Sequence, residues 1–285
     1  MHKVKVFLEM IKFEHTVFAL PFAYMGGFLA AGTVPPAGKL LWITLAMVGA
    51  RTAAMSLNRL IDRRLDALNP RTAGRALPAG HLGVAEVSLY AVLSFLLLGY
   101  SAYRLNLLAL ELMPIAVFFL VFYSYTKRFT WACHFALGLA LGLAPPGAWI
   151  GVTGHWALAP VLLGLGVMSW VAGFDIIYAS QDIEFDRKKG LKSIPAVFGL
   201  KRGFEISALL HVVAPLLFVM VGVVLHLHVL YYLGVAVAVI LLFRQHRMVS
   251  VDNLSKVGIA FFNLNGYLSV LMFVFSLADV LLFRW

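Results

Sequence analysis

At residues 58–80 the chain reads Asn58-Arg-Leu-Ile-Asp62-Arg-Arg-Leu-Asp66-Ala-Leu-Asn-Pro-Arg71-Thr-Ala-Gly-Arg75-Ala-Leu-Pro78-Ala-Gly80, and this segment follows an apolar run that begins near Leu40. On a helix, residues at i, i+4 and i+8 share one face, so Asn58, Asp62 and Asp66 point the same way at the end of a membrane-length helix. Two carboxylates one turn apart repel each other unless a cation lies between them. Hard oxygen ligands beside a basic loop suit Mg²⁺ with a phosphorylated substrate, and the alternative is a solvated charged boundary without a site.

The composition identifies a membrane protein. Of the 285 residues, 62% are hydrophobic and 13% are charged, whereas soluble domains carry about 25% charged residues. The net charge of +10 does not indicate nucleic-acid binding, because the basic residues cluster in short loops between apolar segments, where they face anionic lipid. The single cysteine, Cys133, excludes an intrachain disulfide and a Cys-based metal site, and no feature of the sequence indicates an obligate protein partner.

The fold class predicted is all-α, a polytopic membrane protein formed by one integral-membrane domain over residues 1–285. Apolar segments of spanning length recur through the whole chain and predict nine transmembrane helices. They cover roughly residues 13–32, 40–60, 84–103, 107–126, 131–151, 158–182, 204–226, 229–244 and 257–283.

The distribution of Lys and Arg predicts the orientation. These residues concentrate in the N-terminal segment and in the loops that follow the second, fourth, sixth and eighth segments. Cytoplasmic loops carry such an excess, so the N-terminus and these basic loops are predicted to face the cytoplasm, in the inner (cytoplasmic) membrane. The acidic residues that directly precede the loops after the second and sixth segments then lie on the same side.

A second acidic stretch repeats the first one. It reads Asp175-Ile-Ile-Tyr178-Ala-Ser-Gln-Asp182-Ile-Glu-Phe-Asp186-Arg-Lys-Lys-Gly-Leu-Lys192-Ser-Ile-Pro195, and Asp182 and Asp186 each follow Asp62 and Asp66 by 120 residues. This echo predicts a bundle of two similar four-helix halves, spans two to five and six to nine, with the first span added in front. Membrane proteins often place their site at such a repeat interface.

Four aspartates on one side of the membrane need cations. If the two helices face each other, Asp62, Asp66, Asp182 and Asp186 are suited to Mg²⁺ ions bridged by a diphosphate, because Mg²⁺ takes one or two carboxylates together with phosphate oxygens and water. The remaining phosphate charge would then be neutralised by Arg71, Arg75 and Lys192.

An apolar tail on a diphosphate head fits this architecture. Ionisation of an allylic diphosphate creates a carbocation, which an aromatic ring stabilises by cation–π attraction and a dry cavity protects from water. Tyr178, one turn before Asp182, is the aromatic candidate, and an ordinary interfacial tyrosine is the alternative interpretation.

These motifs resemble those of the UbiA superfamily of intramembrane aromatic prenyltransferases. The resemblance rests on Asn58-x-x-x-Asp62-x-x-x-Asp66, Tyr178-x-x-Gln181-Asp182-x-x-x-Asp186, Lys192-Ser193 and Tyr123-Ser-Tyr-Thr-Lys127-Arg128, and it extends over almost the whole chain. It implies a nine-helix bundle, Mg²⁺ dependence, and transfer of a polyprenyl chain from its diphosphate to an aromatic carboxylate in menaquinone or ubiquinone biosynthesis. By the same resemblance, Asn58 and the four aspartates form the metal and diphosphate site, with Lys127 and Arg128 at the phosphate side.

The aromatic acceptor is less well defined by the sequence. The segments at 71–80 and Phe262-Asn263-Leu-Asn265-Gly266-Tyr267 resemble the branch linked to the futalosine menaquinone route, which implies 1,4-dihydroxy-6-naphthoate, and 4-hydroxybenzoate remains the other acceptor. Glu14, His15 and Asp175 are the candidates for contact with it. A membrane transporter is the rival hypothesis; it would place its acids near mid-membrane, whereas both acidic pairs here lie at span ends beside basic loops.

Overall fold

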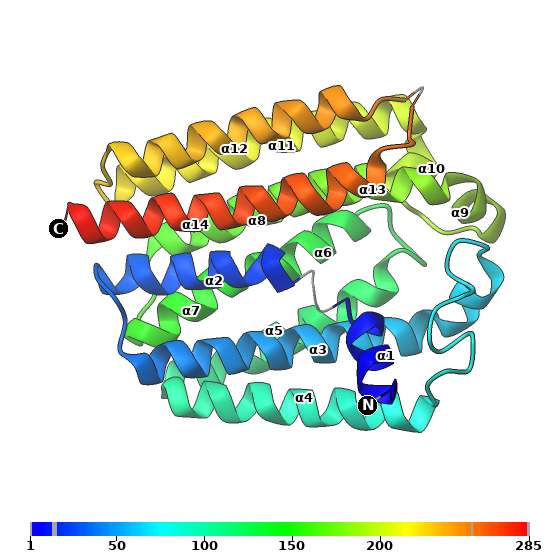
Figure 1. Ribbon diagram of the computed structural model, residues 1–285, viewed down its shortest axis with the longest axis horizontal. Helices are drawn as coiled ribbons and strands as arrows, with labels where there is room; N and C mark the ends of the chain where they lie inside the picture. Colours follow the sequence, from blue (N-terminus) through cyan, green and yellow to red (C-terminus); the bar gives the residue numbers. More distant parts are fainter. Residues whose placement is uncertain (1, 13–15, 252, 284–285) are drawn as a thin grey trace.

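The structure is a bundle of helices that run side by side along one axis (Figure 1). It is a computed structural model that describes residues 2–12, 16–251 and 253–283, and within these ranges it contains helices and one isolated β-bridge but no strand. The helices are α1 (His2–Met10), α2 (Thr16–Ala31), α3 (Ala37–Leu68), α4 (Val84–Leu105), α5 (Leu107–Thr126), α6 (Cys133–Gly142), α7 (Ala144–Thr153), α8 (Leu158–Ala179), η2 (Ser180–Asp182), α9 (Ile183–Lys189), α10 (Ile194–Phe198), α11 (Leu200–Val224), α12 (Val229–Met248), α13 (Val257–Ile259), η3 (Ala260–Leu264) and α14 (Asn265–Leu282). The predicted all-helical membrane fold is confirmed.

Eight segments of the described chain are long and apolar enough to cross a membrane, against the nine predicted. They correspond to the second to ninth predicted segments. The first gives α2, whose 16 residues extend only about 24 Å, less than the hydrocarbon thickness of roughly 30 Å. The ninth span and the arrangement in two four-helix halves therefore remain predictions.

Two predicted continuous helices are interrupted. The fifth segment breaks at Leu143 into α6 and α7, and the Pro145-Pro146 pair at the start of α7 explains the break because proline has no N–H to donate to the preceding turn. The sixth segment tightens into a 3₁₀ turn at Ser180–Asp182 before it continues as α9. Asp182 and Asp186, spaced i, i+4 like the first pair, therefore lie on either side of a change in helix geometry, whereas α3 continues to Leu68 and carries Asn58, Asp62 and Asp66 on a single helix.

The core of the bundle is formed around α8. In the most apolar stretch of the span Leu158–Lys189, which begins with α8, 72% of the residues are buried, more than in any other spanning segment described. Trp170 of α8 packs against Phe174 on the same helix and against Phe22 of α2, and Phe22 in turn packs against Phe218 of α11. The loop after α3 lies at one end of the bundle together with α9 and α10, and we call this the charged end (Figure 1).

Glycines allow α6 to approach α8 closely. A Cβ atom on Gly138 would lie 2.4 Å from the carbonyl oxygen of Met168, and Gly142 and Gly164 approach each other in the same way, at 2.5 Å. Backbone atoms cannot move aside as a flexible side chain can, so we expect Gly138→Ala to destabilise the protein by about 1–3 kcal/mol. Gly147→Ala is the matched control, because nothing lies within 4 Å of a Cβ at that position. The apparent Tm of the two variants in detergent checks this, and equal values would contradict it.

Asp279 is a buried carboxylate at the end of the bundle away from the charged end. It accepts hydrogen bonds from the backbone N–H groups of His228 (2.9 Å) and Tyr231 (3.1 Å) and so caps the start of α12 from the neighbouring α14. Removal of the carboxylate leaves buried N–H groups without an acceptor, so Asp279→Ala is expected to destabilise the protein by about 2 kcal/mol or more. Asp279→Asn retains an acceptor oxygen and should lower the apparent Tm less than Asp279→Ala does; the opposite order would refute the capping role.

Candidate active site

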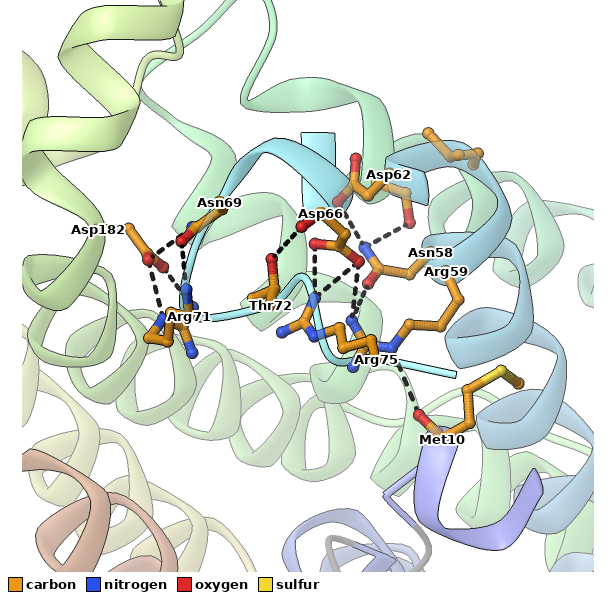
Figure 2. A network of polar contacts seen from close by, with 12 residues as sticks. Met10, Asn58, Arg59, Asp62, Asp66, Asn69, Arg71, Thr72, Arg75 and Asp182 are labelled. Atoms are coloured by element: carbon orange, nitrogen blue, oxygen red, sulfur yellow. Dashed lines mark hydrogen bonds and ion pairs between the residues drawn. The ribbon is translucent and has the colours of Figure 1, made fainter. Parts of the chain in front are cut away.

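The charged end brings the two acidic motifs together through the loop that follows α3. Asn69, the residue after the helix, donates from its amide to Asp182 Oδ1 at 2.9 Å. Arg71 donates from Nε to the same oxygen at 2.8 Å and pairs through Nη2 with the other carboxylate oxygen. Figure 2 shows Asp182 held in this way beside the group around Asp66. The ends of α3 and α8, far apart in sequence, therefore form one site.

Arg71 also contacts Tyr178. Its Nη1 donates to the phenolic oxygen at 3.0 Å, and its guanidinium lies 5.2 Å from the centre of the tyrosine ring. Burial alone would lower the pKa of Arg71, but the hydrogen bonds to Asp182 and the Tyr178 hydroxyl outweigh burial and raise the pKa. Arg71 is thus a permanent cation between the two motifs.

Asp66 is tied to the same loop. Arg75 Nη1 donates to both of its carboxylate oxygens, at 2.8 and 2.9 Å, and Arg59 Nη1 lies 4.0 Å from Oδ2. The hydroxyl of Thr72 donates to the backbone carbonyl of Asp66 at 3.0 Å and holds the loop against the helix end (Figure 2). Asp66 is almost fully buried, which makes these partners necessary, because a buried carboxylate needs both a countercharge and hydrogen bonds.

Asp62 faces α5. Lys127 Nζ donates to Oδ2 at 2.6 Å, and Arg128 Nη2 donates to Oδ1 at 2.7 Å. Asn58, one turn earlier on α3, points its amide at Asp62 Oδ2 and at Ser124, both at 3.4 Å. The side chain of Asp62 is only 3% exposed, so its charge is enclosed by its two basic partners.

Asp186 and Lys192 lie on the far side of the same site. Ser193 donates from its hydroxyl to Asp186 Oδ2 at 2.7 Å, and the N–H of Leu191 bonds to the Asp186 carbonyl. The N–H of Lys192 donates to the Lys127 carbonyl at 2.7 Å, so the loop after α9 is fixed to the end of α5, while the side chain of Lys192 is exposed.

The geometry suits a bound anion with cations more than a preformed metal cage. Five basic residues, Arg59, Arg71, Arg75, Lys127 and Arg128, surround three of the four aspartates at ion-pair distance. Among the described residues, no three His, Cys, Asp or Glu side chains gather closely enough to hold a metal ion. This donor set fits Mg²⁺, which takes one or two carboxylates and completes its shell with phosphate oxygens and water.

An apolar cavity of about 400 Å³ lies between α3, α4, α5, α6 and α7. It extends along α3 from Ile43 to Met55, about 18 Å at 1.5 Å per residue, and its end nearest the charged end is lined by Ala54, Met55 and Tyr123. Met55 is one helical turn from Asn58, so the cavity begins next to the polar site. Arg51 and Tyr123 are its principal polar lining residues.

The predicted site residues divide into three groups. The structure brings together Asn58, Asp62, Asp66, Arg71, Arg75, Lys127, Tyr178 and Asp182, with Asp186 and Lys192 joined to them through the loop after α9. Asp175 lies two turns before Asp182 and accepts a hydrogen bond from His134 at 2.7 Å. Glu14 and His15 lie outside the described residues.

Three residues that contact the aspartates were not predicted as part of the site. Asn69 directly precedes Pro70, which is a turn signal, and nothing in the sequence indicates that its side chain donates a hydrogen bond to Asp182. Ser193 directly follows Lys192 in the second motif, and this position next to a predicted site residue was the signal that could have identified it. Arg59 gave no signal beyond its charge, because its contact with Asp66 depends on the tertiary arrangement.

Fold and site together define a helical integral membrane protein with a charged cluster next to one end of an apolar cavity. We call this cluster, formed by the four aspartates and their basic partners, the chamber. Comparison with known proteins identifies its family: residues 19–274 match the UbiA prenyltransferase family, and the chain belongs to that family. The 4-hydroxybenzoate octaprenyltransferase of Aliivibrio fischeri is 32% identical over 90% of this chain and 89% of its own. That of Photobacterium profundum is 28% identical over 96% of both chains.

Solved structures agree with this assignment. A UbiA homologue from Aeropyrum pernix K1 superposes with a TM-score of 0.80 at 30% identity, covering 94% of this chain and 97% of its own. A UbiA homologue from Archaeoglobus fulgidus, solved with GPP and Mg²⁺, has a TM-score of 0.75 at 20% identity and covers 96% of this chain and 99% of its own. At that identity the second comparison supports the fold alone.

Proposed function

We propose that this protein transfers a polyprenyl group from an allylic polyprenyl diphosphate to a hydroxylated aromatic carboxylate, with release of diphosphate. The observation that carries the proposal is the convergence of two acidic motifs and their basic partners beside one end of an apolar cavity. A diphosphate head with an apolar tail is the substrate that uses both parts. The family and the names of the relatives support the same reaction class.

The basic residues have a clear part in substrate binding. Without substrate, Lys127 and Arg128 neutralise Asp62, Arg75 neutralises Asp66 and Arg71 neutralises Asp182. Cations held by the aspartates would replace these countercharges, and the arginines and the lysine would then be available to the diphosphate oxygens, which guanidinium groups bind bidentately. The chamber thus remains close to electrically balanced in both states.

Asn58 and the four aspartates would hold Mg²⁺, as the fit of their oxygen donors suggests. Bound Mg²⁺ would supply stabilisation of the negative charge that develops on the leaving diphosphate. The protein's own residues do the rest: Tyr178 presents an aromatic face beside Asp182, and the apolar cavity holds the prenyl tail and excludes water from the allylic centre.

The acceptor is proposed to enter between the chamber and the cavity. Arg51 lies seven residues before Asn58 on α3, and Asp175 lies seven residues before Asp182 on α8, so both are about 10 Å below their motifs. Arg51 suits a carboxylate, and Asp175 suits a phenolic hydroxyl. Both 4-hydroxybenzoate and 1,4-dihydroxy-6-naphthoate carry these two groups, in ubiquinone or menaquinone biosynthesis respectively.

The proposed setting is the inner (cytoplasmic) membrane, with the charged end and the N-terminus facing the cytoplasm and residues 1–285 acting as one prenyltransferase domain. The basic loops at the charged end support this orientation.

The test is a donor and acceptor panel with the purified protein. We expect Mg²⁺-dependent release of diphosphate from geranyl diphosphate when one of the two aromatic acids is present, with a prenylated product identified by mass. Ranking the two acids by kcat/KM identifies the acceptor. Absence of product with every hydroxylated aromatic carboxylate would reject the proposed function.

A further inference from the structure

His134 lies outside every role described so far, yet it is buried and fully engaged. It is on α6, its Nδ1 lies 2.7 Å from Asp175 Oδ2, and its Nε2 lies 3.2 Å from the backbone nitrogen of Ile194. These two partners come from α8 and from the start of α10, which lie far apart in the chain.

The partners determine which ring nitrogen faces a donor. A backbone N–H can only donate, so Nε2 of His134 presents its lone pair to Ile194. Nδ1 then carries a hydrogen and donates it to the carboxylate of Asp175. His134 therefore has one donor side and one acceptor side, and the two sides are not interchangeable.

The acceptor side of the bridge fixes the loop next to the diphosphate chamber. Ile194 directly follows Ser193, whose hydroxyl donates to Asp186 Oδ2 at 2.7 Å. Lys192, the residue before Ser193, donates its N–H to the backbone carbonyl of Lys127. The ammonium group of Lys127 donates in turn to Asp62. Through Ile194, His134 fixes the loop that orients Ser193 and the backbone of Lys192.

The donor side of the bridge fixes Asp175. This aspartate belongs to the most deeply buried span, yet 23% of its side-chain surface remains accessible. His134 occupies Oδ2, so the orientation of the carboxylate is set while part of it stays open to a ligand. A fixed, accessible carboxylate below the diphosphate is suited to accept a hydrogen bond from the hydroxyl of an aromatic acceptor.

We propose that His134 is a positioning residue that orients two substrate-binding regions at once, Asp175 toward the aromatic acceptor and the Ser193 loop toward the diphosphate. This inference rests on the proposed function and adds to it the specific group that couples the two substrates. Because Nδ1 contacts Asp175 and Nε2 contacts Ile194, a substitution can remove one contact and keep the other.

The test compares His134→Asn with His134→Gln. The amide of Asn reaches the position of Nδ1 and retains a donor for Asp175 but no acceptor for Ile194, so KM for the prenyl diphosphate should rise about tenfold while KM for the aromatic acid changes little. The amide of Gln reaches the position of Nε2 and retains the acceptor for Ile194 but loses Asp175, so the opposite pattern is expected. Asp175→Asn, which keeps an oxygen for His134 but loses the charge, should reproduce the Gln pattern.

His211 provides the matched control. It is also a buried histidine with two ring contacts, to His246 of α12 at 2.9 Å and to the carbonyl of Trp170 of α8 at 3.2 Å, but it lies on α11 and contacts none of the site residues described above. His211→Asn and His211→Gln should leave both KM values within about twofold of wild type, whatever they do to the apparent Tm. If the two His134 variants shift the same KM, or shift neither while wild type turns over, the positioning role is wrong. If wild type itself yields no product, the proposed function has failed instead.

Discussion

Replacement of Asp182 by Asn is expected to lower kcat/KM for the prenyl diphosphate by about 10²–10³-fold, the range seen when one preorganised electrostatic group is lost. The substitution preserves the shape of the side chain but removes the charge that Arg71 neutralises and that a bound cation would use. It also leaves the Arg71 guanidinium without its countercharge between the two motifs. Steady-state kinetics with a saturating aromatic acid measures the effect.

Glu184→Gln is the control for this substitution. Glu184 lies between Asp182 and Asp186 on the same stretch of chain, but it is exposed. The two variants lose the same charge within two residues of each other, so only the chamber geometry separates them. Near-wild-type turnover in Asp182→Asn, or an equal loss in Glu184→Gln, would remove Asp182 from the site.

The second large effect is expected at Lys127. Its ammonium group donates to Asp62 at 2.6 Å, and its backbone carbonyl holds the Lys192 N–H. Lys127→Met keeps the backbone contact and the length of the side chain but removes the charge that is proposed to pass from Asp62 to the diphosphate. We expect kcat/KM to fall about 100-fold, mainly through kcat, because the negative charge on the leaving group grows in the transition state.

Lys189→Met provides the comparison for a general loss of positive charge. Lys189 is exposed at the end of α9, in the same basic region. If the chamber attracted diphosphate only through its overall positive charge, the two lysine variants would lose similar activity. Activity of Lys127→Met close to that of Lys189→Met would contradict the assigned role of Lys127.

The sequence predicted the fold class and most of the residues that the structure gathers at the charged end, because both depend on local pattern. Apolar runs of spanning length predict helices without knowledge of tertiary contacts, and the part of the chain that the structure describes contains eight of them. The spacing of Asn58, Asp62 and Asp66 was interpreted correctly because α3 continues to Leu68 as one helix. The 120-residue echo supported the pairing of the two motifs, and Arg71 now shows their contact directly.

What the sequence could not predict depends on contacts between distant segments or on local backbone geometry. The 3₁₀ turn at Ser180–Asp182 has no proline or glycine to announce it. Asn69 gave a turn signal, but its contact with Asp182 exists only because the loop after α3 meets the end of α8. His134 belongs to no motif of the sequence, and its two partners, Asp175 and Ile194, are 41 and 60 residues away in the chain.

The central claim is that the two acidic motifs bind one diphosphate through shared divalent cations. The most direct measurement is electron paramagnetic resonance of Mn²⁺ added in place of Mg²⁺, with an unreactive geranyl thiolodiphosphate as the ligand. We predict that the wild-type protein binds Mn²⁺ tightly only when this ligand is present, and that Asp62→Asn and Asp182→Asn each abolish that binding although they lie on different helices. Mn²⁺ binding that is independent of the diphosphate, or that survives the loss of either aspartate, would contradict the account.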